Sequence, residues 1–375
     1  MDLSTSFQLS AVSSQQSNSR STAKKRIAVG FGDYIIAAIG ARVDRSTMAT
    51  VANLRPINEG VSFEVFRAMR LDPASGRQSP VAVKILKNLP SGQRLSDPEK
   101  DEFRASQVDS LVQEVRILCH SPLRDHDNIL RILEWGMGLQ DELAEERDEA
   151  WEKVAPFICV ELAELGSLKE YPLISQIPAE TKRELCLDVV LGLTALHACN
   201  AAHGDIKLEN VLVFPHPERL LSAKLSDFSH SFSPSFTSCG TSAYFGTERC
   251  EPPEVGSSRN QKRTLHDLMR CDVWALGYLS VEMIANGQIP SDRGVDTLSY
   301  GLDLITRAED MDSSLKDIWK DFIQNCLKND PEERETVQNL RVLLDITSRS
   351  EPLVAAPIND CSTVFGTIPV SRLDP

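Results

Sequence analysis

The sequence has few of the features that mark several common protein classes. Its nine cysteines are scattered singly, with an odd total and no C-x-x-C pair, so they indicate neither a disulfide framework nor a zinc site. No apolar run is long enough to span a bilayer, and the N-terminal stretch lacks the apolar core of a secretory signal. We therefore expect a cytoplasmic protein in a reducing, intracellular compartment.

The sequence also lacks net positive charge, because 54 Asp and Glu residues outnumber 40 Lys and Arg residues and give a formal net charge of −14. This balance argues against the phosphate-driven attachment of nucleic-acid binders and against docking on anionic membranes. A small anionic ligand would need a local basic site. We therefore expect neither nucleic acid nor a membrane among the partners, and the sequence gives no indication of the oligomeric state.

The 375 residues are enough for two domains, or for two lobes of one domain. Residues 1 to about 25 offer few apolar side chains to offset the entropy of ordering, which predicts disorder there. The apolar, glycine-punctuated segment 27–40 lacks the full G-x-G-x-x-G spacing, which favours a packed strand or short helix over a nucleotide-binding loop.

From about residue 51 the pattern is of the β type, with segments at 57–70 and 79–87 separated by a turn. A helical stretch at 109–120 carries Leu111, Val115 and Leu118 at helical spacing. Strands are predicted at 128–136 and 155–163, joined by the acidic run 141–153, which we interpret as a solvated insertion. Helical patterns follow at 178–200, 271–287, 314–330 and 336–347. This order predicts an α+β fold with a small β-rich lobe, a larger helical lobe and a cleft between them.

The run HGDIKLEN at residues 203–210 places an Asp, a Lys and an Asn at fixed offsets between two apolar stretches. Its composition alone favours a surface loop that joins a helix to a hairpin. Six other short segments accompany it in a fixed order: VAVK at 81–84, VQEVRIL at 112–118, FICVELAELGSL at 157–168, AKLSDFSHS at 223–231, GTERCEPPE at 246–254 and CDVWALG at 271–277. Together these segments resemble the eukaryotic protein kinase family, over roughly residues 51–345.

The resemblance implies an ATP site with magnesium. In the family a strand lysine binds the α- and β-phosphates and a helix glutamate holds it in place, roles that Lys84 and Glu114 match. The residue before the inter-lobe segment is the gatekeeper Val160, and the main chain of Glu161 and Ala163 would bind adenine. Further residues of the nucleotide site implied by the resemblance are Ile57, Gly60, Val65, Ala82 and Leu212.

The resemblance also assigns the chemistry to HGDIKLEN. Asp205 matches the carboxylate that accepts or orients the proton of the attacking hydroxyl, and Lys207 would neutralise charge on the transferred phosphoryl group. Asn210 and Asp227 match the two magnesium ligands. Thr247 would contact Asp205 and Lys207, a combination that resembles the Ser/Thr-specific branch, so the implied partner is a protein substrate with a Ser or Thr acceptor.

Three matched residues are implied to support the site. Glu254 should form a buried ion pair with Arg334 in the segment DPEERET, and Asp272 should brace the backbone of the catalytic loop.

The sequence also departs from the family pattern. Of the three glycines in the phosphate-covering loop only Gly60 is retained, with Asn58 and Phe63 in the other two places, which reduces the expected nucleotide affinity. Gly204 replaces the arginine that would bind a phosphorylated activation segment, which argues against that mode of control. Ser229 replaces the last glycine of the D-F-G segment.

Three hypotheses follow from these matches and departures. The first is an active Ser/Thr protein kinase, and the second is a pseudokinase that serves as a nucleotide-binding or scaffold module. The third is a small-molecule phosphotransferase with a related fold, because HGD followed by Asn is also typical of that group. Thr247, Asp272 and Arg334 resemble features of the protein-substrate segment and favour the first two.

The resemblance predicts the domain boundaries as well. We expect an N-terminal extension at 1–50, a kinase domain at 51–345 with its lobes at 51–163 and 164–345, and a tail at 346–375. The run HPERLLSAKLSDFS and the acidic insertion resemble kinase-like proteins of filamentous fungi.

Overall fold

The computed structural model describes residues 44–46, 51–59, 63–72, 75–86, 96–139, 154–171, 177–236, 240–289 and 296–345. Our expectations for the segments 1–25, 27–40 and 141–153, for Gly60 and for the tail from 346 lie outside these residues.

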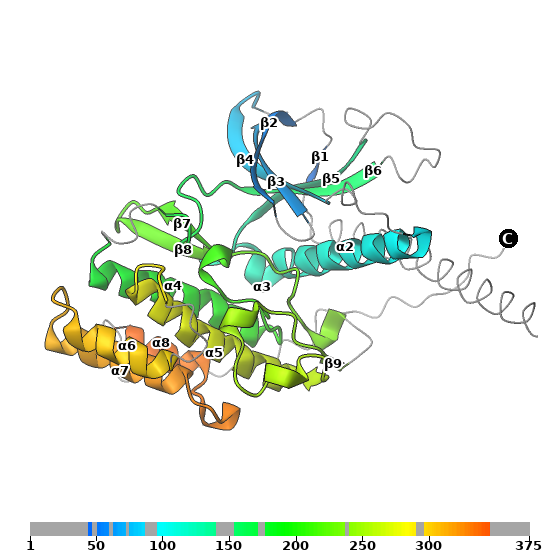
Figure 1. The fold of residues 1–375 in the computed structure, drawn as a ribbon. Coiled ribbons are helices and arrows are strands. Elements are labelled where there is room, and N and C mark those ends of the chain that lie inside the picture. Colours follow the sequence, from blue (N-terminus) through cyan, green and yellow to red (C-terminus); the bar gives the residue numbers. More distant parts are fainter. Residues whose placement is uncertain are drawn as a thin grey trace, which may run out of the picture.

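A six-stranded sheet forms the upper lobe in Figure 1. Its order is β1 (Asp44–Ser46), β5 (Ile132–Leu139), β6 (Val154–Glu161), β4 (Gln78–Leu86), β3 (Phe63–Leu71) and β2 (Val51–Glu59). Neighbouring strands pair antiparallel except β1, which runs parallel to β5. The strand β1 thus belongs to the sheet although it precedes residue 51, where we expected the domain to begin.

Strand periodicity decides which way Lys84 points. In β4, Val81 and Val83 pack into one apolar cluster, whereas Ala82 and Leu86 pack into another that includes residues of helix α2 (Asp97–Leu118). Because alternate side chains of a strand point to opposite faces, Lys84 shares the face of Ala82 and Leu86. That face is the one that α2 covers in Figure 1, so the lysine points toward this helix.

Helix α2 is longer at its start than the predicted stretch 109–120. Ser96 precedes its first turn and donates from its main-chain N and its Oγ to the carboxylate of Glu99, both at 2.7 Å. This contact and the proline in the first turn fix the helix start. The three apolar residues of the predicted stripe, Leu111, Val115 and Leu118, are all buried.

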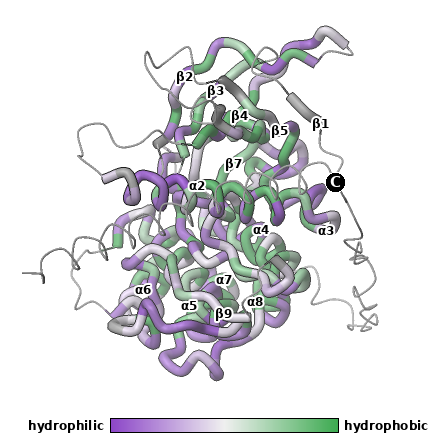
Figure 2. Tube along the Cα trace, turned by 90° about the vertical axis from the view of Figure 1, so that its right-hand side faces the viewer, coloured by the Kyte–Doolittle hydropathy of each residue, from purple (hydrophilic) through white to green (hydrophobic). Residues whose placement is uncertain are grey.

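The lower lobe is helical, as predicted. Its helices are α4 (Ala179–Ala198), α5 (Leu265–Ile284), α6 (Thr297–Arg307), α7 (Ser313–Cys326) and α8 (Val337–Leu344), and the short α3 (Ser121–Arg124) follows α2. Figure 2 shows α4 mostly in green, the colour of hydrophobic residues, and purple segments along the lower edge. The α+β prediction of a β-rich lobe and a larger helical lobe is confirmed, while α6 was not predicted.

A predicted hairpin of β7 (Val211–Pro215) and β8 (Leu221–Leu225) lies between the lobes in Figure 1. The carboxylate of Asp188 on α4 accepts from the main-chain N of Ala223 at 2.9 Å and from Arg219 at 3.1 Å. These contacts fix the hairpin to α4, and thereby also fix the positions of the segments that precede and follow it.

A second, smaller ladder joins β9 (Thr241–Ser242) to β10 (Arg263–Thr264).

The predicted ion pair between Glu254 and Arg334 is present. The guanidinium of Arg334 binds the carboxylate of Glu254 through two hydrogen bonds of 2.7 Å, and the Arg334 side chain is fully buried. Among the described residues, none of the helices combines the length and the apolar character needed to cross a bilayer.

Candidate active site

Six of the eight residues of HGDIKLEN are buried, so the surface loop that its composition alone favours is not formed. His203, Asp205 and Asn210 are 0%, 3% and 5% exposed. The reason is a carboxylate below the loop: Asp272, on the buried face of α5, accepts from the main-chain N of His203 and of Gly204, both at 2.8 Å. These bonds satisfy two buried N–H groups and hold the loop in place, which is the bracing role that the sequence predicted for Asp272.

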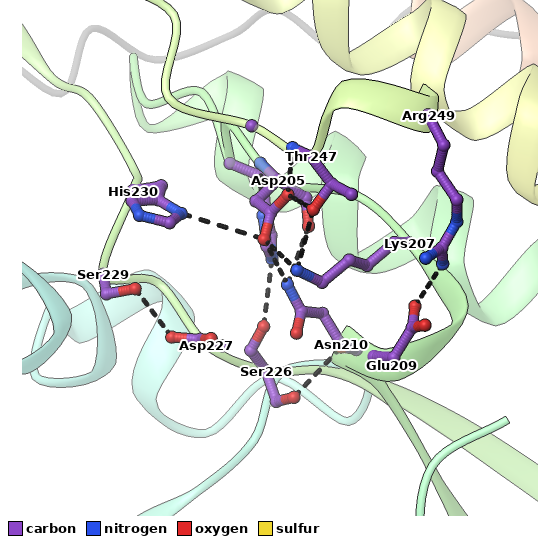
Figure 3. A network of polar contacts seen from close by, with 12 residues as sticks. Asp205, Lys207, Glu209, Asn210, Ser226, Asp227, Ser229, His230, Thr247 and Arg249 are labelled. Atoms are coloured by element: carbon purple, nitrogen blue, oxygen red, sulfur yellow. Dashed lines mark hydrogen bonds and ion pairs between the residues drawn. The ribbon is translucent and has the colours of Figure 1, made fainter. Parts of the chain in front are cut away.

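Asp205 lies at the centre of a hydrogen-bond network (Figure 3). Its Oδ1 accepts from the main-chain N of Thr247 at 2.8 Å and from Thr247 Oγ1 at 2.7 Å. Its Oδ2 accepts from Lys207 Nζ at 2.6 Å and from Asn210 Nδ2 at 3.1 Å. Although burial opposes ionisation, the nearby His230 and the hydrogen bonds from Lys207 and Thr247 lower the pKa of Asp205 far below its usual range. The carboxylate is therefore ionised and fixed in orientation at neutral pH.

Lys84 joins the two lobes. Its Nζ donates to both carboxylate oxygens of Glu114, at 2.6 and 2.7 Å, and lies 3.7 Å from Asp227 Oδ1. Glu114 reaches it because it lies between Leu111 and Leu118 on the buried stripe of α2. Although burial disfavours the ammonium, Glu114 and Asp227 raise the pKa of Lys84. Charged groups from β4, from α2 and from the segment after β8 thus meet at one point.

Asp227 has a left-handed backbone, with φ of +61°, and its Oδ1 accepts a hydrogen bond of 2.8 Å from Ser229 Oγ. Partial burial opposes its ionisation, but Lys84 and Ser229 lower the pKa of Asp227. The next residue, Phe228, is fully buried, and its ring lies 5.1 Å from the His203 ring. The serine in the place of a glycine therefore supplies a donor to the carboxylate.

The oxygens of Asn210 and Asp227 fit a magnesium ion. Asn210 Nδ2 donates to the main-chain O of Asp205 at 2.8 Å, so its Oδ1 is the atom left for a cation. Carboxylate and amide oxygens are hard ligands of the kind that Mg²⁺ prefers. Within the described ranges no group of three or more His, Cys, Asp or Glu residues could hold a metal ion. Magnesium bound by few protein ligands and by substrate phosphates does not need such a group.

The structure places most of the predicted nucleotide-site residues on one side of the sheet and on β7. Ala82 and Val160 are paired across β4 and β6, and Val65 is paired with Lys84 across β3 and β4. Val65 and Leu212 pack, partly buried, against the same apolar cluster as Ala82 and Val160. The exception in packing is Ile57 on β2, which is 49% exposed and belongs to none of the apolar clusters of described residues.

The inter-lobe segment begins at Glu161, the last residue of β6, and Ala163 follows two residues later. The Glu161 carboxylate accepts from the main-chain N of Arg131 at 2.8 Å and from Lys224 Nζ of β8 at 2.8 and 3.0 Å. Gly166 N donates to the main-chain O of Ala163 at 3.1 Å. The side chain of Glu161 therefore connects the sheet to the hairpin.

Phe63, which stands in the place of a family glycine, is only 4% exposed. Its ring centroid lies 4.8 Å from Lys84 Nζ, a cation–π distance. The bulky side chain thus occupies space directly beside the ammonium group.

Two histidines of the site were not predicted. His203 Nε2 donates to the main-chain O of Ser226 at 3.1 Å, and its Nδ1 accepts from Asp205 N at 3.3 Å. Burial lowers the pKa of His203, which agrees with a neutral ring. His230 Nδ1 lies 3.7 Å from Asp205 Oδ2. The position of His203 directly before Gly-Asp is a signal that could have been used, whereas nothing in the sequence indicates the contact of His230.

Gly204 has φ of +81°, and a Cβ atom there would overlap the main-chain oxygen of His230. We expect Gly204→Ala to destabilise the fold, because the loop must move away from His230. The free energy of unfolding in denaturant measures the effect.

Gly287→Ala is the matched control. Gly287 has nearly the same φ, +79°, but a Cβ atom there would meet no atom within 4 Å. Gly287→Ala should cost only the backbone strain of about 1–2 kcal/mol in the free energy of unfolding. Equal effects of the two substitutions would show that the overlap with His230 is unimportant.

Comparison with known proteins agrees with this arrangement. The sequence model of the family described as Protein kinase domain matches residues 53–342. Serine/threonine-protein kinase dst1 of Dictyostelium discoideum is 30% identical over 49% of this chain and 24% of its own length. Serine/threonine-protein kinase ste20 of Aspergillus oryzae is 25% identical over 77% of this chain and 29% of its own length.

A third relative, the membrane-associated tyrosine- and threonine-specific cdc2-inhibitory kinase of Drosophila melanogaster, is 27% identical over 76% of this chain and 45% of its own length. The chain thus spans less than half the length of each of these three relatives.

Proposed function

The chain belongs to the protein kinase domain family, and on this premise we propose that it transfers the γ-phosphoryl group of ATP, with magnesium, to Ser or Thr hydroxyls of protein substrates. We assign this activity to residues 51–345. The observation that carries the proposal is the meeting of Lys84, Glu114 and Asp227 beside a catalytic loop whose Asp205 is ionised and fixed. Phosphoryl transfer depends mainly on positioning and electrostatic stabilisation, which such a set supplies.

In the proposed reaction the acceptor hydroxyl oxygen forms a bond to the γ-phosphorus while the bond from that phosphorus to the bridging oxygen breaks, releasing ADP. Asp205 orients the hydroxyl and takes its proton. Lys84 would bind the α- and β-phosphates, and Lys207, which lies 2.6 Å from Asp205, would stabilise charge on the transferred group. Magnesium held by Asn210 and Asp227 would supply neutralisation of the phosphate charge.

The preference for Ser and Thr rests on the contacts of Thr247. Its Oγ1 donates to Asp205 and accepts from Lys207 Nζ at 2.9 Å, the combination that resembles the Ser/Thr-specific branch. Two of the relatives described above are named serine/threonine-protein kinases, and the third is named as tyrosine- and threonine-specific. The acceptor amino acid must therefore be measured.

A second candidate function is a pseudokinase that binds nucleotide or a partner without turnover. The observation that favours it is Phe63, which is buried against Lys84 in the place of a glycine. An aromatic ring at that point competes for the space that phosphates would need near the ammonium.

The test uses the purified full chain with ATP labelled on the γ-phosphate, a Ser- and Thr-containing protein, and either magnesium or excess chelator. We expect magnesium-dependent label on phosphoserine or phosphothreonine, identified by acid hydrolysis. Label on phosphotyrosine alone, or on a sugar or antibiotic but never on protein, would contradict the proposal. Nucleotide binding in a thermal-shift assay without any transfer would favour the pseudokinase.

A further inference from the structure

A second charged cluster lies beside the catalytic loop. Arg249 Nη2 is 2.5 Å from Glu209 Oε2 and 3.7 Å from Glu282 Oε2. Glu209 is part of the 3₁₀ turn Leu208–Asn210 that ends the HGDIKLEN run, and Arg249 follows Thr247 in the next turn, Glu248–Cys250. We call Glu209 and Glu282 the acidic pair.

Glu282, the more deeply buried member of the acidic pair, has a carboxylate oxygen without a hydrogen-bond partner among the described residues. Glu282, on α5, is 3% exposed, and its Oε1 accepts from Lys169 Nζ at 2.7 Å. Its Oε2 is buried and has no hydrogen-bond partner within the part of the chain that the structure describes. A buried carboxylate oxygen in this position favours a nearby cation, and the guanidinium of Arg249 is the cation that faces it.

The charges of the cluster cancel. Two carboxylates, Glu209 and Glu282, are balanced by Arg249 and Lys169. Burial disfavours charge on Arg249, but its hydrogen bond to Glu209 and the nearby Glu282 carboxylate raise the pKa of the guanidinium. The same hydrogen bond lowers the pKa of Glu209 against the effect of burial. These shifts favour the charged forms of Arg249 and Glu209, and the cluster of two carboxylates and two cationic side chains has a formal net charge of zero.

The cluster is accessible and lies to one side of Asp205. The side chains of Arg249 and Glu209 are 37% and 35% exposed. Figure 3 shows them on the Lys207 side of Asp205, whereas His230 and Ser229 lie on the opposite side. When a polypeptide places a hydroxyl group at Asp205, the residues on one side of that Ser or Thr would therefore lie near Arg249 and Glu209.

We propose that Arg249 is a specificity-determining residue, which neutralises the acidic pair from within the chain and makes a basic residue beside the acceptor unnecessary for substrate recognition. This inference rests on the proposed function. With Arg249 in place, a substrate arginine meets a neutral cluster and gains little. Without it, the acidic pair and Lys169 carry one net negative charge around a buried carboxylate oxygen, which is a site for a guanidinium.

The experiment compares the full chain with its Arg249→Ala variant. The substrates are otherwise identical peptides with one serine and with Arg, Ala or Glu at each flanking position in turn. We expect the wild type to use the Arg and Ala peptides with kcat/KM values within about threefold. The variant should prefer an Arg peptide over its Ala counterpart by about tenfold or more, because a charge-assisted hydrogen bond to a buried carboxylate becomes available.

The control is the double variant Arg249→Ala with Glu209→Gln, which should lose most of the gained preference. Arg249→Met keeps the volume of the side chain and replaces the alanine variant if that one unfolds in a melting experiment. A wild type that already prefers Arg peptides tenfold, or a folded variant that gains no preference, would overturn the inference.

A binding measurement separates this inference from the proposed function. Fluorescence anisotropy of labelled Arg and Ala peptides needs no turnover. If no peptide is phosphorylated by the wild type, the proposed function fails, and tighter binding of Arg peptides by Arg249→Ala than by the wild type still supports the role of Arg249. Equal binding by the two proteins overturns it.

Discussion

Asp205→Asn is expected to lower phosphoryl transfer by about 10³-fold, the effect of removing a general base. The amide has nearly the same shape as the carboxylate, so Thr247 can still donate to its oxygen. It carries no negative charge, however, and cannot take the hydroxyl proton or pair with Lys207. The rate of label transfer from ATP at saturating substrate measures the loss, and thermal melting with and without nucleotide shows that folding and ATP binding are retained.

The control is Asp317→Asn. Asp317 is an exposed carboxylate on α7, a helix that carries none of the residues of the candidate active site. This substitution should leave the rate unchanged. A folded Asp205→Asn protein that retains more than about a tenth of the wild-type rate would exclude Asp205 as the base. The pseudokinase hypothesis predicts instead that neither the wild type nor the Asp205→Asn variant transfers any label.

Arg334→Ala is expected to lower the free energy of unfolding by about 3–5 kcal/mol. Its guanidinium donates to both oxygens of Glu254 at 2.7 Å and to the main-chain oxygens of Arg270 and Lys328 at 2.9 Å each. It also lies 5.0 Å from the ring of Trp274. The substitution removes all of these contacts and leaves the Glu254 carboxylate without its cation, which is the costly way to break a buried ion pair. Equilibrium unfolding in denaturant gives the value.

A surface ion pair supplies the matched control. Arg307 and Asp303 are 2.9 Å apart on α6, but their side chains are 76% and 48% exposed. Arg307→Ala should therefore cost less than about 1 kcal/mol. Arg334→Lys tests the geometry, because an ammonium group cannot form two parallel bonds to a carboxylate and also reach both carbonyls. A loss below about 1 kcal/mol for Arg334→Ala would show that the pair is not important for stability.

The family resemblance predicted the pairing of Lys84 with Glu114, and the structure shows why it forms. Lys84 lies on the α2 face of β4, and Glu114 lies between Leu111 and Leu118 on the buried stripe of α2, so these two residues face each other. The two lobes and the hairpin behind the catalytic loop followed from similar periodicities. Predictions of this kind succeed where one period persists over several turns or strands.

The remaining features depend on contacts between segments that are distant in the sequence. Arg249 and Glu209 are ordinary charged residues until the fold places their side chains 2.5 Å apart. Phe63 could be recognised as a lost glycine but not as a neighbour of Lys84. The start of α2 was missed because the apolar stripe begins well after Ser96, although the run S-D-P-E at 96–99 is a recognisable helix start.

The connection of Glu161 to Lys224 has a consequence for motion. Glu161 ends a strand of the upper lobe, whereas Lys224 belongs to the hairpin that is fixed to α4. Any rotation that lifts the sheet away from the hairpin about residues 162–166 must stretch this contact. A partly exposed ion pair is worth only about 1 kcal/mol, so thermal energy breaks it frequently. The pair therefore stabilises the arrangement in which the sheet lies against the hairpin, while thermal motion can still open it, as the proposed binding and release of a nucleotide would require.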